Sequence, residues 1–146
     1  MQQNEILKLK GELRVVLNKE DGTSQQFDHL NLVVDTGLNF IVSRMEGTSD
    51  AVMSHMAIGA DTAAAAAGNT ILGSELGRVA LTSTTVSTNT ITYVATFPAG
   101  TGSGAVTEAG IFNASSAGTL LCRTVFPVVN KQSGDSMTIT WTVTVS

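Results

Sequence analysis

Apolar and polar residues alternate with a period of two along several stretches of the chain. The clearest stretch places five apolar residues between threonines, namely Met137, Ile139, Trp141, Val143 and Val145. Residues 6–17 alternate in the same way, with leucine and valine on one side and mostly charged residues on the other. Because successive side chains of a strand point to opposite faces, both stretches predict strands with one buried and one exposed face.

The same period recurs in shorter stretches that are separated by turn signals. These predict strands at residues 23–27, 54–59, 79–81 and 91–97. Residues 30–34 either continue the first of these strands or form the next one. Two further apolar runs, 106–112 and 119–126, flank a cluster of small residues. That arrangement is typical of a β-hairpin with a short loop.

A helical period appears once, after the break at residues 35–37. Leu38, Ile41, Val42 and Met45 recur at helical spacing, and Gly47 follows them. The pattern predicts a helix at about residues 36–46, with Asp35 or Thr36 as its N-cap. We expect its apolar stripe to lie against the strands.

Together these elements predict an all-β fold, an antiparallel β-sandwich of about seven to nine strands with one short helix. At 146 residues the chain fits a single domain, residues 1–146. The polar residues 1–5 are a candidate N-terminal arm. Residues 60–70, rich in alanine, are expected to form an exposed and partly flexible loop, and 98–104 a glycine-rich connection.

Composition narrows the function classes. Only 14% of residues are charged and the net charge is −4, with no basic cluster of the kind that non-specific nucleic-acid binding requires. No apolar run approaches the length of a membrane helix, and the first residues do not resemble a signal peptide. We therefore expect no nucleic-acid or membrane partner, and synthesis in a cytoplasm. Cys122, the single cysteine, reads as a small buried hydrophobe.

Few residues are suited to catalysis. The histidines, His29 and His55, have no nucleophile motif near them in the sequence. The run P-A-G-T-G-S-G lacks the Lys-Ser/Thr pair of a phosphate-binding loop. His, Cys and carboxylate residues show no metal-ligand spacing. The sequence therefore predicts no enzyme, no metal and no cofactor.

Charged residues within the predicted hairpin are the remaining polar feature. Alternation places Glu108 on the same side as Val106, Gly110 and Phe112, and a buried acid needs a partner. Arg78 is the preferred partner and Arg123 the second, which predicts a structural ion pair. A paired-carboxylate site of Glu75 with Glu108 is the less favoured interpretation.

Five segments in this order resemble small structural proteins of tailed bacteriophages. They are M-A-I-G at 56–59, L-G-S-E-L-G-R at 72–78, T-E-A-G-I-F-N-A at 107–114, G-T-L-L-C-R-T-V-F-P at 118–127 and T-I-T-W-T-V-T at 138–144. The middle segments are also similar to the attachment domain of phage tail fibres. The resemblance implies a non-enzymatic β-rich domain that attaches to a symmetric shell or tail, with a location in the virion.

The sequence ends directly after the last predicted strand, which favours a decoration protein over a complete fibre. Our leading hypothesis is a capsid decoration or cement protein that binds the major capsid protein. The alternative is a tail, collar or baseplate adaptor that binds other virion proteins. In either case virion geometry leads us to expect a homo-oligomer. A carbohydrate-binding module that recognises a host-surface glycan is a second alternative.

Overall fold

Nine strands and one helix are found in residues 5–47 and 50–146, the part of the chain that the computed structural model describes. In chain order the elements are β1 (Leu9–Asn18), β2 (Ser24–Val33), α1 (Asp35–Glu46), β3 (His55–Gly59), β4 (Glu75–Ala80), β5 (Ser83–Ser87), β6 (Thr90–Phe97), β7 (Gly104–Phe112), β8 (Leu120–Lys131) and β9 (Ser136–Val145). All paired strands are antiparallel. The predicted all-β class is confirmed.

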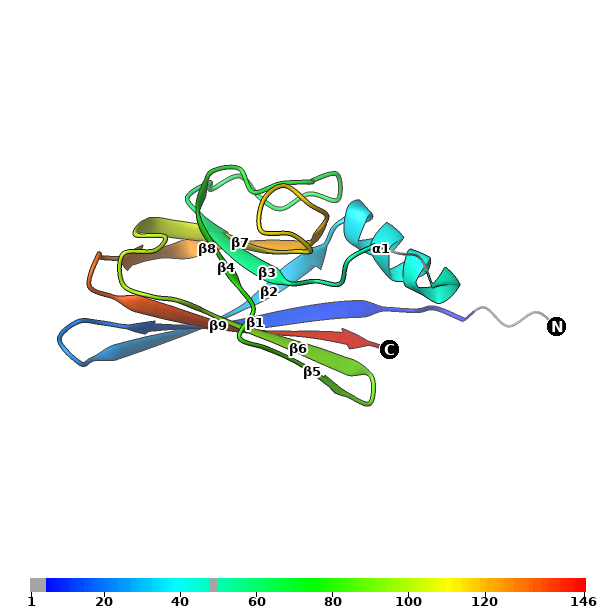
Figure 1. The fold of residues 1–146 in the computed structure, drawn as a ribbon, viewed down its shortest axis with the longest axis horizontal. Helices are drawn as coiled ribbons and strands as arrows, with labels where there is room; N and C mark the ends of the chain where they lie inside the picture. Colours follow the sequence, from blue (N-terminus) through cyan, green and yellow to red (C-terminus); the bar gives the residue numbers. More distant parts are fainter. Residues whose placement is uncertain (1–4, 48–49) are drawn as a thin grey trace.

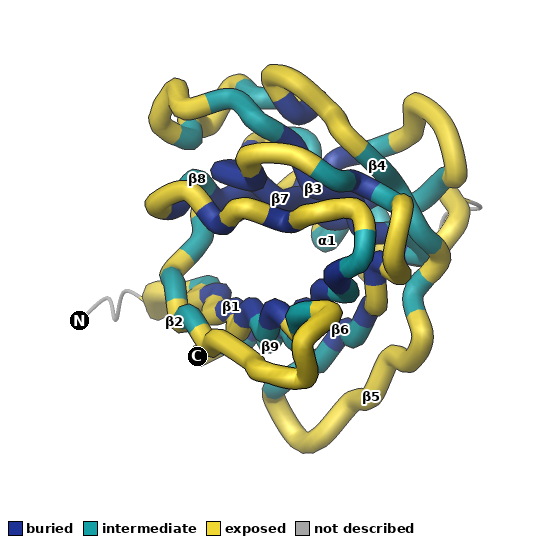
Figure 2. The backbone as a smooth tube through the Cα atoms, turned by 90° about the vertical axis from the view of Figure 1, so that its left-hand side faces the viewer, coloured by how far each residue is buried: buried dark blue, intermediate teal, exposed yellow. Residues whose placement is uncertain are grey.

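The strands form one sheet in the order β4-β3-β7-β8-β2-β1-β9-β6-β5, and this sheet curls so that its two halves face each other (Figure 1). We call β4, β3, β7 and β8 the upper layer, and β2, β1, β9, β6 and β5 the lower layer (Figure 2). β2 joins the layers, because it pairs with β1 along most of its length and with β8 at Leu32 and Val33. The expected sandwich is thus a single curled sheet.

The chain passes between the two layers a second time at Leu81 and Thr82, and this connection nearly closes the sheet. Leu81 donates its backbone N–H to Ser54 next to the upper layer, and Thr82, the next residue, donates to Val94 in the lower layer. This connection joins β4 and β5, which are consecutive along the chain and form the two edges of the sheet.

The core lies between the layers. The inward face predicted for residues 137–143 is confirmed: Met137, Ile139, Trp141 and Val143 are buried, and so are Leu13, Val15 and Leu17 of β1. The Trp141 ring is fully buried, and its indole N–H donates to the side-chain oxygen of Asn31 at 3.0 Å. A buried indole requires such an acceptor.

The helix forms at the predicted place, but of the predicted packing stripe only Ile41 lies against the core, and the prediction is wrong for Leu38, Val42 and Met45. Leu38, Val42 and Met45 are 41%, 64% and 86% exposed, while Gly37 is buried and Phe40 and Ile41 pack partly against the core. The close approach of Gly37 to β8 sets this face: a Cβ on Gly37 would lie 2.0 Å from the Leu121 carbonyl oxygen.

The predicted cap is also wrong. The N-cap residue is Val34, which makes no side-chain capping bond. Thr36, one of the two expected caps, instead donates its hydroxyl to the Leu120 carbonyl at 2.7 Å. The other, Asp35, donates its backbone N–H to Ala67. Both bonds tie the start of the helix to neighbouring segments.

Other boundaries also differ from prediction. β2 is continuous from Ser24 to Val33, which is the first of the two alternatives left open for residues 30–34, and β4 begins at Glu75, earlier than expected. β5 was not predicted, because Ser83–Ser87 is exposed on both faces and has no apolar alternation. Of the candidate N-terminal arm, residues 1–4 lie outside the described residues, and Glu5 is exposed.

We predict that Gly37→Ala destabilises the fold, although alanine in a helix interior ordinarily adds about 0.5–1 kcal/mol of stability. The added methyl group meets the backbone of β8, which costs about 1–3 kcal/mol in a packed site. Thermal unfolding followed by circular dichroism measures this as a lower midpoint.

Gly68→Ala is the matched control, because a Cβ on Gly68 has no heavy atom within 4 Å. We expect its unfolding free energy to stay within about 0.5 kcal/mol of the wild type. Equal midpoints for the two variants would contradict the packing assigned to Gly37.

Candidate functional site

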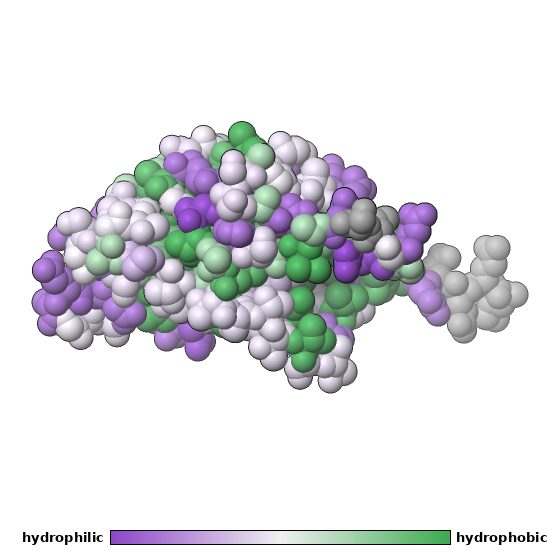
Figure 3. Space-filling model, in the orientation of Figure 1, coloured by the Kyte–Doolittle hydropathy of each residue, from purple (hydrophilic) through white to green (hydrophobic). Residues whose placement is uncertain are grey.

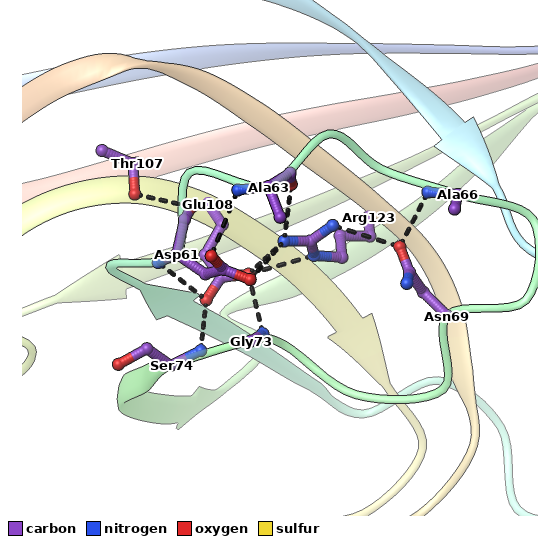
Figure 4. A network of polar contacts seen from close by, with 9 residues as sticks. All are labelled: Asp61, Ala63, Ala66, Asn69, Gly73, Ser74, Thr107, Glu108 and Arg123. Carbon is purple, nitrogen blue, oxygen red and sulfur yellow. Dashed lines mark hydrogen bonds and ion pairs between the residues drawn. The ribbon is translucent and has the colours of Figure 1, made fainter.

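A buried ion pair lies on the outer side of the upper layer, between β7 and β8 (Figure 4). Glu108 is fully buried and Arg123 is 2% exposed. The Arg123 Nε donates to Oε2 of Glu108 at 3.0 Å, and a terminal guanidinium nitrogen lies 2.9 Å from the same oxygen. Charge-assisted bonds of this kind are about twice as strong as neutral ones.

The rest of the Glu108 carboxylate binds the 60–74 loop, which runs from the end of β3 to the start of β4. Oε1 accepts the backbone N–H groups of Asp61 at 3.3 Å and Ser74 at 2.7 Å. Oε2 also accepts the N–H of Gly73 at 3.0 Å. An ionised carboxylate has about four acceptor positions. Those of Glu108 are all occupied, so this carboxylate is not free to act as a general base.

Arg123 holds the middle of the same loop. It donates to the side-chain oxygen of Asn69 at 3.1 Å and to the carbonyl of Ala63 at 3.1 Å. Asp61 adds a second carboxylate at 3.5 Å. The loop is mostly exposed, as predicted, but both of its ends and its middle are fixed to the sheet by one ion pair.

Two glycines make room for this arrangement. A Cβ on Gly59 would lie 2.4 Å from Oε1 of Glu108, and one on Gly73 would lie 1.7 Å from a carboxylate oxygen of Asp61. Real Cβ atoms do not come so close to other heavy atoms. Glycine at these positions therefore allows the loop backbone to approach the buried carboxylate.

An irregularity in the β7–β8 pairing decides which way Glu108 points. The register shifts between Val106 and Glu108, so Val106 lies in the core between the layers while Glu108 faces outward. Thr107 is buried as well, and its hydroxyl donates to the Asp61 carbonyl at 2.8 Å. The predicted shared side of Glu108 and Val106 is thus wrong, because a bulge interrupts the alternation.

Arg78, the preferred partner of Glu108 in the sequence analysis, lies elsewhere. Its guanidinium pairs with Glu75 at 2.7 Å, and it stacks over the Phe112 ring at 3.8 Å from the centroid. It also donates to the carbonyls of Ala114 and Ala117 in the β7–β8 loop. Arg123, the second choice, is the true partner, because the register places it across from Gly110, diagonal to Glu108.

The two arginines therefore have similar roles on the outer side of the upper layer, because each holds one loop. Arg123 holds the 60–74 loop, and Arg78 holds the 113–119 loop. Beneath the loops lies a small second core, separate from the main one, made of Val34, Ala57, Leu72, Phe112 and Leu120. Sequence reasoning missed Asp61 and Asn69, because isolated polar residues in a loop look the same whether they are solvated or bonded.

The other candidate groups stay apart from this network. His55 lies 2.8 Å from the hydroxyl of Ser54, and His29 stacks on the Phe126 ring at 5.0 Å. Cys122 is buried, as predicted, and burial raises the pKa of its thiol. Among the described residues, no group of three or more His, Cys, Asp and Glu residues is placed to hold a metal ion. Within the same residues, no helix has both the length and the apolar character needed to cross a bilayer.

Comparisons with family models, with curated proteins and with solved structures gave no match. The function is therefore argued from the residues of this chain.

We predict that Glu108→Gln lowers the unfolding free energy by about 3–5 kcal/mol, the usual cost of removing one member of a buried ion pair. The amide leaves Arg123 with only the more distant carboxylate of Asp61, at 3.5 Å, and presents an N–H₂ group to donors that need an acceptor. Chemical denaturation measures the change. Amide hydrogen exchange should also become faster in residues 60–74.

Glu75→Gln is the control, because it removes a carboxylate from a partly exposed pair. Pairs of that kind contribute about 0–1 kcal/mol. If both variants lost the same stability, the central role of Glu108 would be refuted.

We also predict a stability change that comes from His29. Burial lowers the pKa of its ring, although Asp28 opposes the shift. The unfolded chain then binds a proton more readily, so stability is lost as the pH falls below the ordinary histidine pKa of about 6.5.

His29→Leu should remove this part of the pH dependence. Unfolding midpoints of the two proteins are compared from about pH 7 to pH 5, where the wild-type curve should fall more steeply. Above pH 7 the curves should run parallel. Equal slopes throughout the acidic range would contradict the role of His29.

Proposed function

We propose that this protein is a structural component of a bacteriophage virion that attaches to other virion proteins, and specifically that it decorates the capsid by binding the major capsid protein. The observation that carries the proposal is the loop surface on the upper layer. The 60–74 and 113–119 loops are presented outward and are held by the buried residues Glu108 and Arg123 and by Arg78.

Pre-organisation is what a binding surface gains from this network. Ala63, Ala64, Ala66 and Ala67 are exposed at the middle of the 60–74 loop. Alanine loses no side-chain rotamer entropy when it is covered. The loop backbone is already fixed by the ion pair, so its ordering cost is met during folding rather than during binding. Such a loop suits a broad contact with another protein.

The same residues carry the resemblance to phage structural proteins. In the segment L-G-S-E-L-G-R, Leu72 belongs to the second core and Glu75 pairs with Arg78. The segments around Glu108 and Arg123 supply the ion pair that holds the 60–74 loop. The segments on which the resemblance to virion proteins rests thus build the loop surface, and this supports the proposed attachment role.

The distribution of aromatic residues favours a protein partner over a glycan. Sugar sites need exposed rings for stacking, and the chain has seven aromatic residues. Five of them are buried, namely Tyr93, Phe97, Phe112, Phe126 and Trp141. The other two, Phe27 and Phe40, pack partly against the core. The face in Figure 3 is largely near-neutral in hydropathy, which suits contacts of low desolvation cost.

We expect the protein to be present in purified virions of the phage that encodes it, at many copies on the capsid. Mass spectrometry of the virions and a reconstruction by electron cryo-microscopy test this. A position only on the tail would replace the capsid proposal with the adaptor alternative. Absence from the particle would overturn the proposed function.

The loop surface is tested by Ala64→Arg, a bulky substitution at an exposed position. We expect the unfolding free energy of the variant to stay within about 0.5 kcal/mol of the wild-type value. Its co-sedimentation with capsids that lack the protein should fall at least about tenfold, because the loop can no longer lie flat on its partner. Gln26→Arg, on the outer face of β2, is the matched control and should bind like the wild type. Equal binding of both variants would refute attachment through this loop.

A further inference from the structure

The two edge strands of the described sheet differ in how they are protected. β4 carries Glu75 and Arg78, which pair with each other. β5 has the sequence S-T-T-V-S and is exposed along its whole length, at the outer corner of the lower layer (Figure 2). An open edge of this kind is a template for pairing with another strand.

β5 has no charge, proline or bulge to protect it from pairing. Proteins protect edges with charges, proline or a bulge. No charged residue occurs between Arg78 and Glu108, and the two prolines are Pro98 and Pro127. The β5–β6 register runs without interruption from Ser83 to Ser87. The edge is therefore both regular and uncharged.

The pairing register identifies the backbone groups that β5 presents. Ser87 and Thr90 close a two-residue hairpin, so these two residues exchange hydrogen bonds. By alternation Thr85 and Ser83 also bond to β6. The N–H and C=O groups of Thr84 and Val86 then point to the open edge.

Val86 gives a second reason to expect a partner. Its register partner is Ile91, which packs partly against the core, so Val86 lies on the inner side of the sheet. It is nevertheless 70% exposed. A large apolar side chain on the inner side of an open edge gains from being covered.

We propose that β5 pairs antiparallel with β5 of a second copy of this chain, about a twofold axis at Thr85. This register lets Thr84 and Val86 bond to Val86 and Thr84 of the partner subunit, which are the groups left open. It also brings each Val86 side chain next to a threonine. The absence of charge favours a second copy, because any charged residue on β5 would lie near its own copy across the twofold axis.

The contact between the two β5 strands is small, so we expect it to be weak. Five residues a side compare with about 20–30 in a standard protein–protein interface. We therefore expect a weak, concentration-dependent dimer in solution. This inference is independent of the proposed location in a virion, and each can fail without the other.

Thr85→Lys tests the pairing. Thr85 faces outward and opposes Thr85 of the partner subunit at a non-hydrogen-bonded position, where side chains are closest. Two lysines there repel each other, so dimerisation measured by analytical ultracentrifugation should weaken about fivefold or more. Thr96→Lys, on the same face of β6, is the matched control and should dimerise like the wild type.

A charge swap separates pairing from misfolding. Thr85→Glu alone should also weaken the dimer, and an equimolar mixture of the Lys and Glu variants should restore it to at least the wild-type level. A wild type that stays monomeric over the whole concentration series overturns the proposal. The same holds if its β5 pairs with a strand of another protein and not with a second copy. A dimer that neither variant affects also overturns it.

Discussion

Burying a carboxylate is costly unless its charge is paired and each acceptor position is used, and the upper layer is built around one such group. Glu108 lies under the 60–74 loop with its negative charge matched by Arg123 and its remaining positions filled by three loop N–H groups. The loop depends on the carboxylate for its conformation. The carboxylate depends on the loop to replace the water that it lost on burial. The two arrangements stabilise each other, so the loop is an integral part of the fold.

The two arginines hold their loops through different sets of partners. Arg78 pairs with Glu75 on its own strand and also donates hydrogen bonds to carbonyls of the 113–119 loop. Arg123 enters a buried site where the carboxylate of Glu108 in β7 meets the carboxylate of Asp61 and the amide oxygen of Asn69 from the 60–74 loop. The guanidinium group, planar and with five donors, suits both tasks, whereas lysine would satisfy fewer of these acceptors.

Long regular patterns predicted the fold class well, and local irregularities account for most errors. β1 and β9 each alternate over ten residues, and their buried faces follow directly. The partner of Glu108 needed the cross-strand register, which a single sequence does not contain. The face of α1 is set by Gly37, a residue without a side chain to enter any periodicity. β5 escaped prediction because a strand that is exposed on both faces has no apolar period.

The place of β9 between β1 and β6 also bears on how the chain folds. Leu13 pairs with Trp141, so the ladder that completes the lower layer joins segments separated by almost the whole described sequence. Contacts of such separation form slowly, because the entropy of closing the long intervening loop is lost before the contacts can stabilise the chain. During synthesis the β5–β6 hairpin emerges well before β9, with both edges open and no charge to keep it from neighbouring nascent chains. Until β9 pairs with β6, this hairpin is therefore open to pairing with strands of other chains.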